Sequence, residues 1–275
     1  MKITTLIENE APESGQLCAE HGLSMLVEID DQRFLFDTGA SGAFLDNANT
    51  LGVSLAPLDA VIISHGHFDH SGGVARLLQK CPAARRFVLG KGYFEEKYKR
   101  TPGQTRYIGT HFTRQQLELA GAELVWVEGK QQLSDHLWAV GGFERTNDFE
   151  ALNPAFVLGE QGTQPDPFAD EIALVAECRK GLVVLAGCSH VGVVNLLRTV
   201  QTRFAQPIYA VIGGSHLVEA DENRIRKTAQ ALEEMGIERC LLSHCTGAAA
   251  ADYLRNQNKV PYGENHTGDV WEFEC

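Results

Sequence analysis

The sequence lacks any excess of positive charge. Its 24 lysine and arginine residues are outnumbered by 36 aspartate and glutamate residues, so the formal net charge is −12 at pH 7. Surfaces that bind nucleic acid normally carry a basic patch, so no nucleic-acid partner is expected. The densest basic stretch, residues 91–106, is interleaved with Glu95 and Glu96. It is interpreted as a solvated helix or loop, with an anion-binding lip over a site as the alternative.

Long hydrophobic runs are also missing. No stretch approaches the roughly 18 apolar residues of a membrane span. Residues 1–15 contain one lysine and no long apolar run, unlike a secretory signal. We therefore expect no membrane partner and a cytoplasmic location.

Cysteine pairs at short spacing do not occur either. The seven cysteines are an odd number and form no CxxC motif. A disulfide framework is therefore not expected, and a reducing compartment fits this pattern.

The remaining composition is that of an ordinary globular protein, with 44% hydrophobic and 22% charged residues. No repeat or linker divides the chain, so one domain over residues 1–275 is predicted. An apolar run followed by a turn with Gly, Ser or His and then a helix is a pattern that recurs along the chain. It is found at residues 60–80, 182–204, 208–235 and 240–256. In α/β proteins functional groups gather at such strand ends, because side chains converge there in a crevice.

Other parts of the chain predict different structure. Short strands are expected at residues 3–7, 25–29 and 34–36, with Asp30-Asp31 as a turn between the last two. Residues from about 90 to 170 are rich in Gly, Thr, Gln and Asp, with shorter strand candidates at 123–127 and 137–140. We interpret this stretch as an irregular, substrate-facing insertion, because long loops are usually functional.

The strongest local signal lies in residues 64–73, directly after a predicted buried strand. Four potential metal ligands occupy six positions there: His65, His67, Asp69 and His70. His65 and His67 lie two residues apart, so in an extended turn they project the same way and can share one ion. Asp69 and His70 fall where the chain starts to coil and can face a second ion.

Four local ligands do not complete two sites. Each zinc-like ion takes three protein ligands and keeps an open position. Three later strand ends each place a histidine just beyond an apolar run, and these are His190, His216 and His244. A single histidine is usually a surface or core residue, but a cluster this dense is typical of a metal site.

The HxHxDH motif, together with Leu35-Phe36-Asp37-Thr38-Gly39, resembles the metallo-β-lactamase superfamily. The resemblance implies an α/β fold, a four-layer αββα sandwich of two mixed β-sheets flanked by helices. The run 182–197 and the GGSHL and HCTG segments resemble one branch. That branch is named for 7,8-dihydropterin-6-methyl-4-(β-D-ribofuranosyl)aminobenzene-5′-phosphate synthase.

The resemblance implies two divalent metal ions, most readily zinc, with iron or manganese as alternatives. The implied ligands of the first ion are His65, His67 and His190, and those of the second are Asp69, His70 and His244. Two such ions lower the pKa of a shared water toward about 7, and Asp69 would orient that water. Asp37 is expected to brace the ligands from behind.

One departure from the family pattern concerns His216. Many members place a bridging Asp after a later strand, but here the strand end reads Gly213-Gly214-Ser215-His216, with no carboxylate until Glu219. A metal ligand, a substrate contact, a catalytic acid and a structural residue all stay open for His216. Without the bridging Asp, the second site should hold its ion less tightly.

Further candidates rest on weaker signals. Thr246, at the start of a predicted helix, could help bind a phosphate, and Arg145 could bind one bidentately. Surface exposure is the alternative for Arg145, and helix capping is the alternative for Ser189.

Cys188 and Cys245 adjoin ligand histidines and are interpreted as packing residues, with a reactive or metal-binding role as the alternative. Asp166, Asp170 and Glu171 are interpreted mainly as loop and turn acids, with a site contact as the alternative.

The function expected from these features is metal-dependent hydrolysis of a phosphoester or related ester of a small molecule. A dihydropterin and ribosyl-phosphate synthase of the same superfamily is one alternative, and a non-catalytic metal or ligand sensor is another. A true β-lactamase is disfavoured because the chain shows no export signal, and ribonuclease activity is disfavoured by its acidity. The substrate is expected to be a small molecule, and the oligomeric state is left open.

Overall fold

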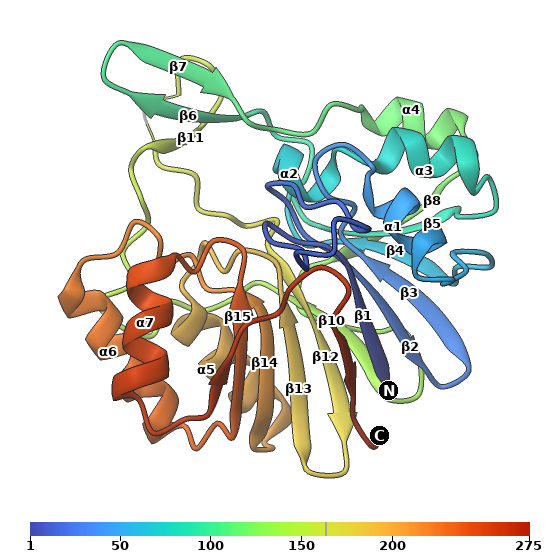
Figure 1. Ribbon diagram of the computed structural model, residues 1–275. Helices are drawn as coiled ribbons and strands as arrows, with labels where there is room; N and C mark the ends of the chain where they lie inside the picture. Colours follow the sequence, from blue (N-terminus) through green and yellow to red (C-terminus); the bar gives the residue numbers. More distant parts are fainter. Residues whose placement is uncertain (163) are drawn as a thin grey trace.

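Two large β-sheets lie face to face in the computed structural model, which describes residues 1–162 and 164–275 (Figure 1). The first sheet has the strand order β17-β1-β2-β3-β4-β5-β8, and the second has the order β16-β15-β14-β13-β12-β10-β9. Each is mixed, with parallel pairs next to antiparallel ones. The predicted α/β sandwich of two mixed sheets is confirmed.

The first sheet comprises β1 (Lys2–Ile7), β2 (Ser24–Ile29), β3 (Gln32–Phe36), β4 (Ala60–Ile63), β5 (Arg86–Gly90), β8 (Glu123–Val127) and β17 (Val270–Glu272). The second comprises β9 (Lys130–Gln132), β10 (Leu137–Gly141), β12 (Ile172–Cys178), β13 (Gly181–Ala186), β14 (Ile208–Gly214), β15 (Arg239–Ser243) and β16 (Tyr262–Gly263). The helices are α1 (Phe44–Thr50), α2 (Phe68–Ser71), α3 (Val74–Lys80), α4 (Arg114–Leu119), α5 (Val193–Phe204), α6 (Glu222–Glu234) and α7 (Ala248–Gln257).

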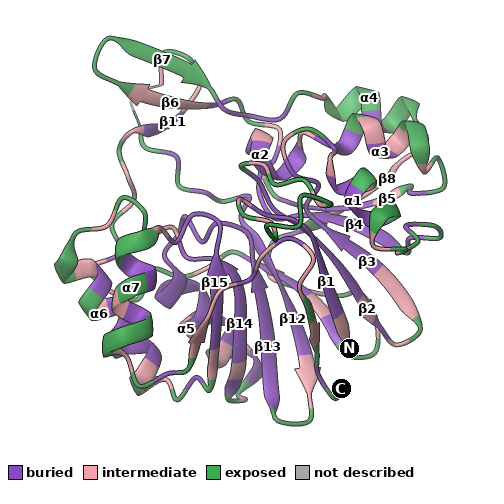
Figure 2. Ribbon diagram, viewed as in Figure 1, coloured by how far each residue is buried: buried purple, intermediate pink, exposed green. Residues whose placement is uncertain are grey.

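Alternation of side chains along each strand produces three core layers. In β13, Val183 and Leu185 pack between the sheets, whereas Leu182 and Val184 pack against α5 and its neighbours. Successive residues of a strand point to opposite faces, so a strand covered on both sides is apolar throughout. Figure 2 shows the result: the strands of the two large sheets are mostly buried, whereas the outer faces of the helices, several loops and β7 are exposed. The chain therefore folds into four layers in the order helix, sheet, sheet, helix.

Parallel strands bring their C-terminal ends to one edge of each sheet. Strands β3, β4 and β5 are parallel neighbours in the first sheet, and β13, β14 and β15 are parallel neighbours in the second. All four predicted strand–turn–helix units are confirmed, including the one from β4 through α3. The turns that follow these strands lie at the upper ends of the two sheets, and both chain termini lie at the lower ends (Figure 1).

The middle of the chain is more regular than the irregular stretch expected from 90 to 170, and the two strand candidates in it are confirmed as β8 and β10. Strand β8 joins the first sheet, and β9 and β10 join the second. A separate three-stranded sheet has the order β11-β6-β7 and consists of β6 (Lys97–Thr101), β7 (Gln104–Tyr107) and β11 (Phe156–Leu158). The four residues of β7 are exposed and mostly polar, so they have none of the hydrophobic alternation that signals a strand.

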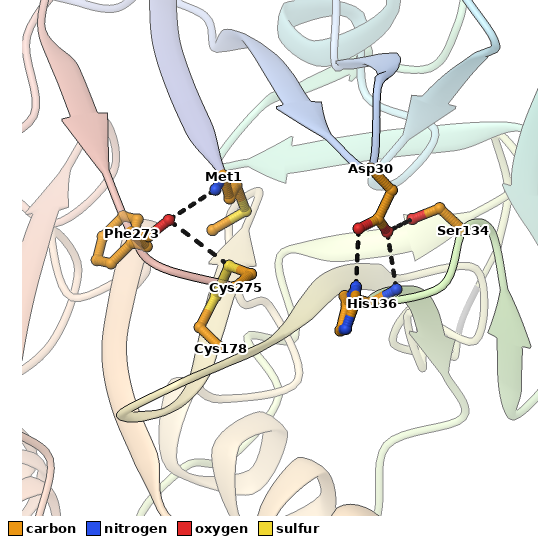
Figure 3. Close-up of a disulfide and its surroundings, with 7 residues drawn as sticks. All are labelled: Met1, Asp30, Ser134, His136, Cys178, Phe273 and Cys275. Atoms are coloured by element: carbon orange, nitrogen blue, oxygen red, sulfur yellow. Dashed lines mark hydrogen bonds and ion pairs between the residues drawn. A yellow bond between two sulfur atoms is a disulfide. The ribbon is translucent and has the colours of Figure 1, made fainter.

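One disulfide, between Cys178 and Cys275, connects the end of β12 to the C-terminus (Figure 3). The cysteine count did not predict this bond. The other five cysteines are free. None of the helices among residues 1–162 and 164–275 has the length and apolarity of a transmembrane span.

The Asp30-Asp31 turn is confirmed as a two-residue hairpin between β2 and β3, and both residues have positive φ. Asp30 also connects the two sheets, because its carboxylate accepts hydrogen bonds from the Ser134 hydroxyl (2.6 Å) and the His136 backbone N–H (2.8 Å) (Figure 3). His136 Nδ1 lies 2.7 Å from the same carboxylate. Burial raises the pKa of Asp30, but these hydrogen bonds outweigh it and lower the pKa. Asp30 in turn raises the pKa of His136.

These opposite shifts predict a stability contribution that is limited to a window of pH. The Asp30 contribution is present above its unfolded pKa of about 4 and is lost as pH falls through the lower folded value. The His136 contribution is present below about 6.5 and is lost as pH rises through its higher folded value. Asp30→Asn should therefore lower the free energy of unfolding by about 1 kcal/mol near pH 5.5, and by less at pH 3 and pH 8.5.

Urea unfolding at the three pH values measures this effect. Asp31→Asn is the matched control, because Asp31 is the exposed neighbour in the same turn and asparagine tolerates positive φ. An equal loss of stability at all three pH values would show that the ion pair contributes nothing.

Candidate metal centre

The first group of potential ligands consists of three imidazoles from two strand ends. His65 and His67 follow β4, and His190 follows β13. Their ring centres are 4.5 to 4.8 Å apart. The Nε2 atoms of all three are buried and have no hydrogen-bond partner in the described chain. Burial lowers the pKa of each ring well below 6.5, so the rings are neutral and their lone pairs are free.

The second group lies directly beside the first. His70 Nε2 is 3.2 Å from His244 Nε2 and 3.1 Å from Cys188 Sγ. The Asp69 carboxylate lies 3.6 Å from His70 Nε2 and 3.5 Å from His244 Nε2. One ligand atom from each of these four residues falls within 4.8 Å of the others. The structure therefore adds Cys188 to the candidate set, a residue that we had interpreted as packing.

Asp37 and Ser64 lie behind both groups. Asp37 Oδ2 is 2.7 Å from His70 Nδ1 and accepts a hydrogen bond from the Ser64 hydroxyl (2.8 Å). That hydroxyl also lies 3.0 Å from His65 Nδ1. Burial would lower the pKa of His70, but Asp37 and Asp69 raise it to about 9. With both Nδ1 atoms engaged from behind, the Nε2 atoms of His65 and His70 face the centre.

Two residues missed by the sequence analysis hold His244 in the same way. Asn9 Oδ1 lies 2.9 Å from His244 Nδ1, and the Glu8 carboxylate accepts the His244 backbone N–H (2.6 Å). Both residues directly follow β1, so the strand-end pattern used for the histidines could have identified them. Burial raises the pKa of Glu8, against the lowering effect of its hydrogen bonds.

His190 is held from its backbone and from one face of its ring. The Glu171 carboxylate accepts the N–H groups of His190 (2.7 Å) and Val191 (2.9 Å). Burial raises the pKa of Glu171 to about 7. The Phe168 ring stacks on His190 at 4.2 Å with an interplanar angle of 4°. Glu171 thus acts from behind the centre, although the sequence suggested a loop acid.

A buried ion pair connects the HxHxDH turn to the three-stranded sheet. Lys97 Nζ lies 2.9 Å from both Asp166 and Asp170, and all three side chains are buried. The Asp170 carboxylate also accepts the Gly66 N–H (2.7 Å). Burial would lower the pKa of Lys97, but the two carboxylates raise it. Lys97 therefore fixes β6 against the loop that carries His65 and His67.

His216 stands at the border of both groups. Its ring centre lies 4.2 Å from that of His190, and its side chain forms a third ligand group with Cys188 and Cys245. Both ring nitrogens are buried and have no hydrogen-bond partner in the described chain. Glu219 Oε2 is 3.8 Å from His216 Nε2. This placement suits a ligand, a substrate contact or an acid, and it argues against a purely structural role.

An open cleft of about 420 Å³ leads to these groups. Its walls include His216, Phe156 and two cations, Lys99 and Arg106. His21, which the sequence analysis missed, also lines it. Its ring stacks on His244 at 5.2 Å, and its Nε2 lies 3.3 Å from Asp69 Oδ2. No strand-end signal marks His21, because it lies in the loop between β1 and β2.

Three predicted contacts do not face the cleft. Arg145 is exposed beside α5 and is not among the residues that line the cleft. The Ser189 hydroxyl donates to the Gly214 carbonyl (2.7 Å), and the Thr246 hydroxyl donates to the Ser243 carbonyl (2.8 Å). Both hydroxyls are therefore engaged by backbone carbonyls. The basic residues at the cleft come instead from the 91–106 stretch, where the anion-binding lip had been the alternative interpretation.

The residues present fit bound cations. Three neutral, buried imidazole nitrogens that face one another lack any hydrogen-bond donor to satisfy them, and a metal ion would satisfy all three. The second group offers a carboxylate, two imidazoles and a thiol, which are ligand types that zinc accepts.

Comparison with known proteins gives consistent results. The sequence model of the metallo-beta-lactamase superfamily matches residues 19–131. The chain is 29% identical to 7,8-dihydropterin-6-methyl-4-(beta-D-ribofuranosyl)-aminobenzene-5'-phosphate synthase of Methanocaldococcus jannaschii, over 99% of this chain and 97% of that protein. It is 30% identical to Tm1679, a metal-dependent hydrolase of the beta-lactamase superfamily, whose crystal structure matches with a TM-score of 0.86 over 100% of both chains. The short form of human tRNase Z has the same fold, at a TM-score of 0.57 and 13% identity over 100% of both chains.

The chain therefore belongs to the metallo-β-lactamase superfamily, as the HxHxDH motif predicted. Its similarity to the synthase extends over nearly the whole of both proteins, so it includes the strand ends that carry His190 and His244.

The Lys97 ion pair generates a prediction about stability. Lys97→Met should leave Asp166 and Asp170 buried without their cation, which costs about 3–5 kcal/mol of unfolding free energy. Urea unfolding followed by circular dichroism measures the loss. Lys91→Met is the control, because Lys91 pairs with Glu128 at an exposed position and should change stability by less than about 0.5 kcal/mol. Similar values for the two variants would refute the role assigned to Lys97.

Proposed function

We propose that this chain is a metal-dependent synthase that joins a dihydropterin to a ribosyl-phosphate compound. The observation that carries the metal dependence is the set of three orphaned Nε2 atoms of His65, His67 and His190. The full-length similarity to the archaeal synthase supports the choice of reaction. The product in that synthase's name contains a bond between the pterin 6-methylene carbon and the aminobenzene nitrogen. That bond forms as a leaving group departs from the carbon and a proton leaves the amine.

Two ions would be held by the two groups described above. The first set is His65, His67 and His190, and the second is Asp69, His70 and His244, with Cys188 within reach. Zinc suits this mixture of imidazole, carboxylate and thiol, and iron or manganese are the alternatives. Such ions supply positive charge that polarises a substrate oxygen and stabilises the negative charge of a departing group.

The chain's own side chains supply positioning and proton transfer. Asp69 faces the cleft with its carboxylate near His21, so it can orient a polar hydrogen of the substrate. His216 lines the cleft and neither of its ring nitrogens has a hydrogen-bond partner among the described residues, so it can accept the amine proton. Phe156 and Phe168 cover the imidazoles of the first group and limit the access of water.

Hydrolysis of a phosphoester or related ester is the second candidate. The similarity to Tm1679, at 30% identity over the whole of both chains, favours it. The same two ligand groups would serve, because a water in the cleft can replace the amine as the nucleophile. The two candidates therefore differ in the nucleophile, an amine or a water, and in the atom attacked, a methylene carbon or the phosphorus or carbonyl carbon of an ester.

Metal affinity provides a test that does not depend on the substrate. Asp37→Asn should keep the turn, since asparagine tolerates the φ of 61° at this position. It removes the negative charge behind His70, so we expect metal affinity to fall about 10- to 100-fold. Isothermal titration with Zn²⁺ measures the change. The exposed Asp31→Asn variant is the control, and unchanged affinity in Asp37→Asn would contradict the role of Asp37.

The reaction itself is tested with a dihydropterin that carries a leaving group on its 6-methylene carbon and with ribofuranosyl-aminobenzene 5′-phosphate. We expect the metal-loaded protein to form the coupled product, detected by mass spectrometry. A chelator or His65→Ala should lower the rate at least 100-fold, while circular dichroism shows that the fold is kept. Hydrolysis of phosphoesters without coupling would favour the second candidate. Stoichiometric binding without turnover would favour a sensor and overturn both.

A further inference from the structure

One row of side chains crosses the three-stranded sheet and lines the cleft. Phe156 of β11 is paired with Lys99 of β6, and Lys99 is paired with Arg106 of β7. Residues directly opposite each other on neighbouring strands share one face of a sheet. All three residues line the cleft. Phe156, Lys99 and Arg106, here called the cleft row, therefore form one of its walls.

The cleft row runs from the ligand groups to the solvent. Phe156 is buried, with its ring centre 5.2 Å from that of His190 and 5.7 Å from that of His216. Lys99 is half-buried, with Nζ 5.1 Å from the Phe156 ring centre. Arg106 is exposed at the mouth. Neighbouring strands lie about 4.8 Å apart. The backbone of Lys99 is therefore about 5 Å from that of Phe156, and the backbone of Arg106 is about 10 Å from it.

The two cations differ in how much charge they can offer to a ligand. Lys99 Nζ is paired with Glu219 at 2.7 Å, so part of its charge is already neutralised. No ion pair involves Arg106 within the part of the chain that the structure describes, and its guanidinium lies over the Phe68 ring at 5.5 Å. A guanidinium presents several N–H donors in a plane, which matches the geometry of phosphate.

His216 provides an independent sign that a polar ligand enters this cleft. Its ring lies near the Phe156 ring of the cleft row and the His190 ring of the first ligand group. Neither of its buried ring nitrogens has a hydrogen-bond partner among the described residues, and Glu219 Oε2 lies 3.8 Å from Nε2. Buried polar atoms are normally paired, so a substrate group that reaches His216 would complete its hydrogen bonding.

We propose that the cleft row binds a phosphate of the substrate that is not the reacting group. This inference rests on the proposed function and specifies its substrate class: a sugar phosphate whose phosphate lies away from the bond that forms or breaks. The reacting end reaches the imidazoles beside Phe156. The phosphate lies nearer the mouth, where Arg106 binds it bidentately and Lys99 adds a second contact.

The alternative arrangement would place the phosphate at the ligand groups. A phosphoester hydrolase binds its phosphate there, because the phosphorus is the centre that reacts. The ligand groups would then supply most of the phosphate contacts, and Arg106→Gln would change phosphate binding little. The position of the phosphate relative to the metal ions therefore separates the two arrangements.

The binding experiment uses the metal-loaded full chain with D-ribose 5-phosphate, D-ribose and inorganic phosphate as probes. Arg106→Gln should weaken ribose 5-phosphate binding about tenfold or more in isothermal titration calorimetry. Ribose binding should not change. Arg100→Gln is the matched control, because Arg100 follows Lys99 in β6 and points to the opposite face. Equal affinities of Arg106→Gln and wild type for ribose 5-phosphate would overturn the proposal.

The position of the phosphate is measured by ³¹P relaxation with Mn²⁺ or Co²⁺ in the site. Ribose 5-phosphate should show a phosphorus-to-metal distance well beyond direct coordination, whereas inorganic phosphate should show coordination. A coordinated ribose 5-phosphate would also overturn the proposal. The thermal midpoint of Arg106→Gln should match that of wild type, since Arg106 is exposed. If the coupling reaction fails but ribose 5-phosphate binding still depends on Arg106, the proposed function is contradicted and the phosphate-binding role of the cleft row is kept.

Discussion

Three buried imidazole nitrogens point at one another across the gap between two strand ends, and the rest of the site is organised around them. A buried polar atom without a partner costs about 1–3 kcal/mol. Three of them together are a large part of the 5–15 kcal/mol by which a folded protein is usually stable. The surrounding residues must therefore hold His65, His67 and His190 in place against this cost. A cation between the three nitrogens removes the cost, which is the physical reason for expecting a metal ion there.

Backbone conformation, hydrogen bonds and a buried ion pair all hold the ligand side chains in this arrangement. Asp37, Ser189, His216 and His244 all adopt positive φ at strand ends, a conformation that is rare for residues other than glycine. Such residues cluster at functional sites, because the surrounding fold must enforce them. Carboxylates and amides behind the ligands then set which imidazole nitrogen faces the centre, as Asp37 does for His70 and Asn9 for His244. The buried Lys97 pair extends this bracing to the three-stranded sheet, so the substrate wall and the ligand turn move as one unit.

Prediction from the sequence succeeded where signals were local or followed the strand-end rule. The quartet from His65 to His70 is visible because its members are close in sequence. His190 and His244 follow apolar runs that become β13 and β15, which flank β14 in one parallel set of strands. The prediction for Arg145 failed because its segment packs along α5, away from the cleft. The sequence favoured a loop acid for Glu171 and a packing residue for Cys188. No local pattern distinguishes a carboxylate or thiol that faces the centre from one that does not.

The sequence by itself determined which imidazole and carboxylate side chains are available for a metal site, and it determined the four-layer fold, because both follow from residue type and from alternation along each strand. Only the tertiary structure decided which charges face the cleft. Lys99 and Arg106 lie in strands without hydrophobic alternation, and their common direction comes from pairing register across β11, β6 and β7. Register is a relation between distant segments, so no local pattern in the chain encodes it.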